Sequence, residues 1–140
     1  MTDTSPDLNR TLARLRASTL SFKVRLAERV EALQVSFADD YDGRQPSPQS
    51  LKGLIDFLES SPPSGYPDLT LTPAGDCYAE WRSSHGKVAI EFLASGDARY
   101  LVFRPNPRHP QRTDRLTGTT TTDALSETMA PLTPLAGVAA

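Results

Sequence analysis

The centre of the chain, from Leu69 to Phe103, alternates apolar and polar residues with the period of two that is typical of β-strands. Val88, Ile90 and Phe92 would share one face of such a strand. Short segments rich in Gly, Asp and Ser separate the runs, and they reverse the chain easily because Gly reaches positive φ without steric cost. The pattern predicts an antiparallel meander of four strands, over residues 69–72, 77–81, 87–93 and 99–103.

Before this region, apolar residues recur every three or four positions from Leu8 to Phe37, with no Gly or Pro among them. This spacing predicts one long amphipathic helix in residues 1–37. A helix of about 30 residues spans about 45 Å, which is longer than four short strands can cover. We therefore expect its N-terminal half to pack on a partner or on a second copy of the chain. The alternative is a helix interrupted at Ser18–Ser21, where Ser and Thr lower helix propensity, and folded back on its own domain.

A second, shorter helix is predicted to begin at Ser47 and Pro48, because Ser is a good N-cap and Pro suits the first helical position. This helix and the four strands form the predicted core, residues 38–103. The expected fold class is α+β, with N-terminal helices packed on a four-stranded antiparallel sheet. Alternate prolines cannot pair in a ladder. After the core we therefore expect a basic, proline-rich loop at 104–121, a short helix at 122–132 and a disordered tail at 133–140.

Composition narrows the classes of protein that this chain can belong to. It has 140 residues and a formal net charge of −2, which fits one domain and argues against a dedicated nucleic-acid binder. Residues 104–115 depart from this balance, with four Arg against one Asp. Cys77 is the only cysteine, so no intramolecular disulfide can form, and a cytoplasmic location is expected. No apolar run approaches the roughly 20 residues that cross a bilayer, so we expect no membrane partner.

Three carboxylates follow the long helix, at Asp39, Asp40 and Asp42. Hard divalent cations prefer such oxygen ligands, so these residues are weak candidates for a metal site. Their spacing is not that of an EF-hand loop, and a solvated turn is the simpler interpretation. We therefore expect no metal site and no cofactor.

Candidates for catalysis are equally weak. Cys77 would need a neighbouring base to act as a nucleophile, and the nearest one, His85, is expected beyond the far end of the strand. Glu80 and Glu91 are expected to point outward separately rather than as a pair for acid–base work. The sequence assigns no catalytic residue.

Residues for binding a partner are the stronger candidates, because large rings and arginines dominate interface energetics. Packing in the sheet is the alternative for Trp81, and a solvated loop is the alternative for the arginines. The predicted interface consists of Leu12, Leu15, Phe22, Leu26, Trp81, Tyr100, Arg104, Arg108 and Arg112.

Four short motifs occur in a characteristic order: Asp40-Tyr41-Asp42-Gly43, Pro46-Ser47-Pro48, Leu71-Thr72-Pro73-Ala74-Gly75 and Ala79-Glu80-Trp81. In this order the chain resembles a widespread group of small bacterial proteins of unknown function, in which Trp commonly stands where this chain has Tyr41. The resemblance covers about residues 37–103. It implies the fold and an accessory role in small gene cassettes, some similar to toxin–antitoxin pairs, and it supplies no catalytic residue.

Three hypotheses for function follow. The first is a non-catalytic protein-binding module, antitoxin-like or regulatory, that holds a protein partner or a second copy in a homodimer through its N-terminal helix and sheet. The second is a nucleic-acid-binding accessory protein that uses the basic arm from Arg104 to Arg115. The third is a small enzyme with an acidic site, in which Asp42, Glu80, His85 or His109 have roles that the sequence does not assign.

Overall fold

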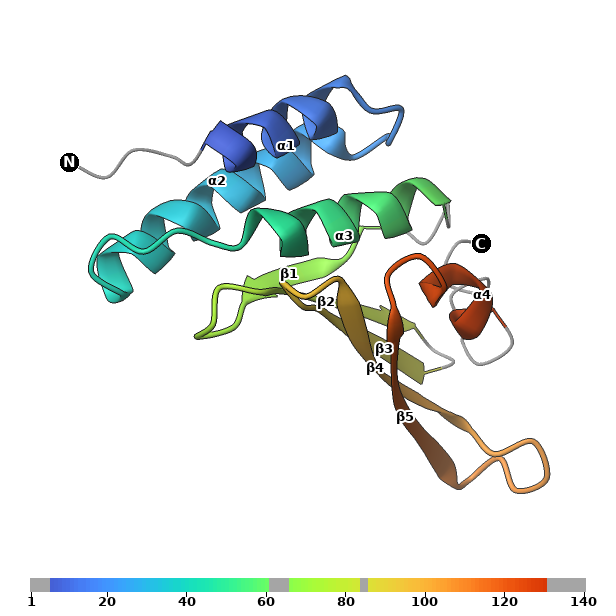
Figure 1. Cartoon of the computed structure of the whole chain (residues 1–140). Coiled ribbons are helices and arrows are strands. Elements are labelled where there is room, and N and C mark those ends of the chain that lie inside the picture. The colour runs from blue at the N-terminus through green and yellow to red at the C-terminus, as the bar shows by residue number, and fades with distance from the viewer. Residues whose placement is uncertain (1–5, 61–65, 84–85, 131–140) are drawn as a thin grey trace.

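The computed structural model of the chain describes residues 6–60, 66–83 and 86–130 (Figure 1). Helices lie over one face of an antiparallel sheet, which confirms the predicted α+β class. The predicted disordered tail at 133–140 and the candidate His85 lie outside the described residues. The elements follow one another as α1 (Pro6–Ala17), α2 (Lys23–Asp40), α3 (Pro48–Ser60), β1 (Asp68–Leu71), β2 (Cys77–Ser83), β3 (Gly86–Phe92), β4 (Asp97–Pro105), β5 (Thr113–Thr121) and α4 (Leu125–Met129).

In the described part of the chain the sheet has five strands in the order β1-β2-β3-β4-β5, so the predicted count of four is wrong. The fifth strand comes from residues 104–121, which we had expected to form a loop. Pro105 stands at the end of β4 opposite Thr113, and Pro107 and Pro110 lie in the turn, so none of these prolines interrupts the ladder. The threonines of β5 are β-branched and favour an extended backbone.

The predicted long helix is wrong as well, because the chain breaks into α1 and α2. The Ser18 amide bonds the Leu15 carbonyl at 3.1 Å and the Lys23 ammonium bonds the Ser18 carbonyl at 3.0 Å, which closes the corner. Helix α1 folds back over α2 and α3 (Figure 1), and Leu8 and Leu15 are fully buried. The folded-back alternative therefore holds, and the excess length that suggested a partner disappears.

The core lies between α3 and the inner face of the sheet. Leu54 and Phe57 of α3 are buried, and the Phe57 ring lies 5.9 Å from Trp81 and 6.0 Å from Phe92, centroid to centroid. Helix α3 begins at Pro48 as predicted, with the Ser47 hydroxyl accepting a hydrogen bond from the Ser50 amide at 3.2 Å.

Ser50 joins α3 to the sheet through its buried hydroxyl. This group donates to the Phe92 carbonyl and accepts from the Cys77 amide at 2.6 Å. We expect Ser50→Ala to lower the free energy of unfolding by about 1–3 kcal/mol, because it leaves two buried backbone groups without this partner. Urea denaturation measures the loss, with the exposed Gln49→Ala as control; equal midpoints for both variants would show that the hydroxyl contributes nothing.

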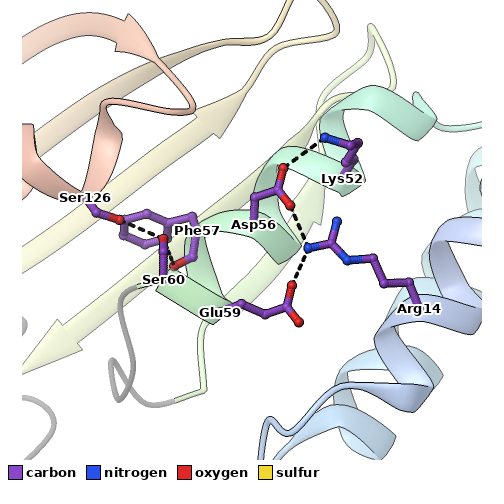
Figure 2. Close-up of polar contacts among 7 residues, drawn as sticks. All are labelled: Arg14, Lys52, Asp56, Phe57, Glu59, Ser60 and Ser126. Carbon is purple, nitrogen blue, oxygen red and sulfur yellow. Dashed lines mark hydrogen bonds and ion pairs between the residues drawn. The ribbon is translucent and has the colours of Figure 1, made fainter.

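Charged side chains connect α1 to α3 at the surface (Figure 2). Arg14 Nη2 lies 2.6 Å from Asp56 Oδ1 and also contacts Glu59, and Lys52 Nζ lies 3.1 Å from Asp56 Oδ2. All four side chains are about a third exposed or more, so these pairs orient α1 and add little stability. At the C-terminal end of α3 the hydroxyls of Ser60 and Ser126 lie 2.9 Å apart and link α4 to α3.

The two edges of the sheet differ. Helix α2 lies beside β1, and Arg29 Nε donates to the Leu69 carbonyl at 3.1 Å. Helix α4 packs against α3 and β5 through the buried Leu125 and Met129, so the predicted short helix is present. Among the described residues, β5 pairs with β4 alone. The helices thus cover the inner face and one edge of the sheet.

Candidate functional site on the open face of the sheet

The open face consists of the strand side chains that point away from the helices. Successive side chains of a strand alternate between the two faces of the sheet. Trp81 and Ile90 point inward, as do the residues paired with them, and the residues on either side of them in each strand point outward. The described helices all lie on the other side of the sheet (Figure 1). The described helices therefore leave this face uncovered, and the register of the strands positions its side chains.

One line of residues crosses four strands at the end of this face, and we call it the basic row. Arg82 of β2 lies opposite Lys87 of β3, Lys87 opposite Phe103 of β4, and Phe103 opposite Arg115 of β5. Three strand spacings of about 4.8 Å give the row a length of about 14 Å. Three cations thus flank one aromatic ring, and the Phe103 ring, which is partly exposed, lies 5.7 Å from Lys87 Nζ.

A single carboxylate holds two of these cations in place. Glu80 accepts from Lys87 Nζ and from Arg82 Nε, both at 2.9 Å. The hydrogen bond from Lys87, supported by the one from Arg82, lowers the pKa of Glu80 although partial burial opposes the shift. The carboxylate therefore stays charged and fixes the Lys87 stem beside Phe103.

The ion pair between Glu80 and Lys87 predicts that the stability of the fold depends on pH. Because the pKa of Glu80 is lower in the folded chain than in the unfolded chain, its contribution is complete above the ordinary glutamate pKa and is lost as the pH falls through the folded value. We expect Glu80→Gln to lower the melting temperature at neutral pH and to match the native chain in more acidic solution. Thermal unfolding across pH measures this; a difference that persists in acid would assign the effect to packing instead.

The β4–β5 hairpin continues the open face outward, and Figure 1 shows it projecting beyond the other strands, away from the helices. Its tip, residues 106–112, is held by Asn106. The Asn106 side chain accepts from the amides of Arg108 at 2.8 Å and His109 at 3.0 Å, and its own side-chain amide donates to Asp114 at 3.0 Å. Backbone bonds from Asn106 to Arg112 at 2.9 Å and from Arg112 to His109 at 2.8 Å close the turn.

The tip is therefore an ordered support for exposed charge. Arg108, His109 and Arg112 are all exposed, as is Arg115 just below them on β5. Arg104, the remaining arginine of the predicted arm, is partly buried on the inner side, where its register partner is Asp114. The arm from Arg104 to Arg115, which the sequence predicted to be a loop, thus carries its exposed positive charge at the tip and on the open face.

Several residues of the predicted interface lie elsewhere. Leu12, Leu15, Leu26 and Trp81 are at most 4% exposed and belong to the core of this chain, so a partner cannot reach them while the domain is folded. Phe22 is partly exposed and lies edge-on to Tyr66, with 5.6 Å between ring centroids.

Tyr100 points to the inner face as well. Its ring covers Gly118 of β5, where a Cβ atom would lie 2.3 Å from the tyrosine oxygen. The ring fills the space that a side chain at position 118 would otherwise occupy. Of the predicted interface, Arg108 and Arg112 are the fully exposed members.

The fold does not bring the candidate catalytic and metal-binding residues together. Cys77 is 2% exposed, and burial raises the pKa of its thiol to about 12, so the nucleophilic thiolate does not form at neutral pH. Asp39, Asp40 and Asp42 are exposed at the end of α2 and beyond it. Within the described ranges no three His, Cys, Asp or Glu residues form a group that could hold a metal ion.

Glu80 and Glu91 also act separately. Glu80 binds Lys87 and Arg82, whereas Glu91 lies 3.9 Å from Arg99 in a different cross-strand line. His109 lies in the turn of the β4–β5 hairpin, whereas Glu80 and Glu91 lie in β2 and β3. The acidic site of the enzyme hypothesis thus gains no support from the described residues.

The chain matches no protein-family model, and searches of curated proteins and of solved structures find no match either. The resemblance drawn from short motifs stays a prediction. Among the described residues no helix has the length and apolar character needed to cross a membrane.

Proposed function

We propose that this chain is a non-catalytic binding module that holds a macromolecular partner on the open face of its sheet and on the β4–β5 hairpin. The asymmetry of the sheet supports this most directly. Helices bury one face, whereas the other carries cations and a partly exposed ring in fixed register and continues onto a projecting hairpin. Charges held in place across a surface favour specific and rapid association with a complementary partner.

The proposal keeps the sheet of the first sequence hypothesis and abandons its N-terminal helix. Leu12 and Leu15 stabilise the domain from inside, so α1 belongs to the scaffold that holds the sheet. The regulatory or antitoxin-like role implied by the resemblance, and the cytoplasmic location suggested by the single cysteine, are parts of this proposal that rest on the sequence alone.

The chemistry of the face also fits binding better than catalysis. Its central carboxylate, Glu80, is engaged by two cations, and the one thiol of the chain is buried on the opposite side of the sheet. A catalytic acid or base needs access to a substrate and a pKa near the working pH. Neither group meets these requirements.

A capture experiment with two matched variants tests the proposal. Thr117 is exposed on β5 next to Arg115, and Val35 is 63% exposed on α2, away from the sheet. From lysate of the native host, we expect the tagged native chain and Val35→Glu to retain the same partner and Thr117→Glu to lose it. Unchanged melting temperatures show that all three chains are folded. Equal retention by all three, or loss only with Val35→Glu, contradicts the proposal.

A further inference from the structure

We infer that the partner on the open face is single-stranded nucleic acid, with a base stacked on Phe103 and the phosphate backbone bound by Lys87, Arg115 and the hairpin tip. This inference rests on the proposed function and specifies its partner. It is carried by two features that meet in one place: a partly exposed ring on the uncovered face of the sheet, and a cation on each side of it, the partly exposed Lys87 and the exposed Arg115.

The first feature is the distribution of charge. Although the chain carries a net charge of −2, the basic row and the tip hold five cations, of which Arg82 and Lys87 pair with Glu80 beside the row. Asp39 and Asp40 are exposed in the last turn of α2, and the C-terminal end of this helix lies far from the β4–β5 hairpin (Figure 1). This separation directs a polyanion towards the hairpin and repels it from the far end. The five cations are Arg82, Lys87, Arg108, Arg112 and Arg115.

The second feature is the ring. Unpaired bases stack on aromatic side chains that stand on an antiparallel sheet, whereas the bases of a duplex are already stacked on one another. Phe103 lies between Lys87 and Arg115 in register, so a base over the ring places its flanking phosphates near a cation on either side. Arginine planes such as that of Arg115 can also stack on bases.

Neighbouring side chains extend this surface along β5. Thr117 and Thr119 follow Arg115 on the same face and are exposed, and hydroxyls are common donors to phosphate oxygens. At the other end of the row, an open hollow of about 290 Å³ is lined by Arg82 and Arg25 together with the carboxylate residues Asp68 and Glu80. A strand of nucleic acid can thus continue from Phe103 along β5.

The rigidity of the tip favours binding as well. Hydrogen bonds around Asn106 and the fixed φ angles of Pro107 and Pro110 hold Arg108 and Arg112 on an ordered turn. Less conformational entropy is lost when a ligand binds to a preorganised surface. An acidic polypeptide would meet the same cations, but its carboxylates do not stack on the ring at their centre as a base does.

Fluorescence anisotropy with a labelled oligothymidylate of about ten nucleotides tests the inference on the full chain. Four phosphate contacts predict a slope of about −3 for log K against log salt concentration. Affinity should therefore fall about 50-fold between about 50 and 200 mM salt. A duplex of the same length should bind at least about tenfold more weakly, because it offers no unpaired base to Phe103.

Variants separate stacking from charge. Phe103→Leu keeps the apolar contact beneath the ring and should weaken binding about tenfold, whereas Phe103→Tyr should bind as the native chain does. Replacing Arg108 and Arg112 together by Gln should reduce the salt slope by about 1.4. Glu80→Gln removes the carboxylate that pairs with Arg82 and Lys87 and should tighten binding about threefold, a gain that a purely structural role of Glu80 would not produce.

Three results overturn the inference. They are equal affinity for oligothymidylate and duplex with no effect of Phe103→Leu, equal affinity for polyglutamate and oligothymidylate, and no binding of any of these probes at low salt. If the capture experiment still identifies a partner that Thr117→Glu loses, the failure is confined to the nucleic-acid inference. If it identifies none, the proposed function fails with it.

Discussion

Leu15→Ala is expected to lower the free energy of unfolding by about 2–5 kcal/mol, the usual loss for a fully buried leucine whose space cannot close. The side chain lies in the last turn of α1 and is buried where α1 packs against α2 and α3. If α1 did not pack on its own domain and instead bound a partner, truncation of Leu15 would scarcely change the stability of the isolated chain. Urea denaturation of the purified protein measures the difference.

Val24 provides the matched control, because it is 62% exposed on α2 and its truncation to alanine should change stability by less than about 0.5 kcal/mol. Hydrogen exchange adds an independent measure, since α1 amides should be protected in the free chain. Equal losses for Leu15→Ala and Val24→Ala, together with rapid exchange throughout α1, would contradict the folded-back arrangement and restore the first sequence hypothesis.

Gly86→Ala should be nearly as damaging, for a reason that lies in the backbone. Gly86 has φ +142°, and a Cβ atom there would lie 2.0 Å from the carbonyl oxygen of Phe103. This neighbour is part of β4 and cannot rotate away, so the β3–β4 ladder must separate where the basic row crosses it. We expect a loss of about 3 kcal/mol or more from strain and broken pairing, and with it the displacement of Phe103 from Lys87.

A substitution at Gly96 separates the cost of backbone strain from the cost of broken strand pairing. Gly96 has a similar left-handed φ of +94°, but an added Cβ would meet no heavy atom within 4 Å. Gly96→Ala should therefore cost only the conformational strain, about 1 kcal/mol. Denaturation midpoints of the two variants give the comparison, and equal losses would show that the close approach of Gly86 to β4 is unimportant.

The elements that the sequence predicted well are those in which local pattern and tertiary packing agree. The alternation over Val88, Ile90 and Phe92 marks a central strand because one of its faces is buried by α3. The start of α3 is equally local, since Ser47 bonds the Ser50 amide within one turn. Such signals need no knowledge of distant residues.

Strand β5 was not predicted because its alternation of apolar and polar residues is weak. Threonine dominates it, so both faces are polar and no apolar alternation appears, while the prolines before it suggested a loop. The signal that could have found it is the run of β-branched residues after a turn, which favours an extended strand on the edge of a sheet.

The corner between α1 and α2 needed tertiary information. The apolar spacing continues through Ser18 and Leu20, and a periodicity of three to four does not show whether a helix is straight or folded back. One helix of this length would extend beyond the sheet, but the chain avoids the excess length by folding back as α1 and α2.

The basic row could not be predicted from the sequence either, because it also depends on tertiary structure. Arg82 and Arg115 are 33 positions apart, and only the register of four strands brings them into line with Phe103. In the sequence the net charge of −2 argues against nucleic acid, and no aromatic residue stands among the arginines of 104–115. Pairing of β4 with β5 supplies the missing ring, because Phe103 lies opposite Arg115 on the same face.

The most direct test of the account is an NMR titration of the isotopically labelled chain with oligothymidylate at low salt. We expect the largest amide shifts at Lys87, Phe103, Arg115 and the tip residues 106–112, and unchanged resonances in α2. Shifts confined to α2 or α1, or no shifts anywhere, would contradict the claim that the open face and the hairpin form the binding surface.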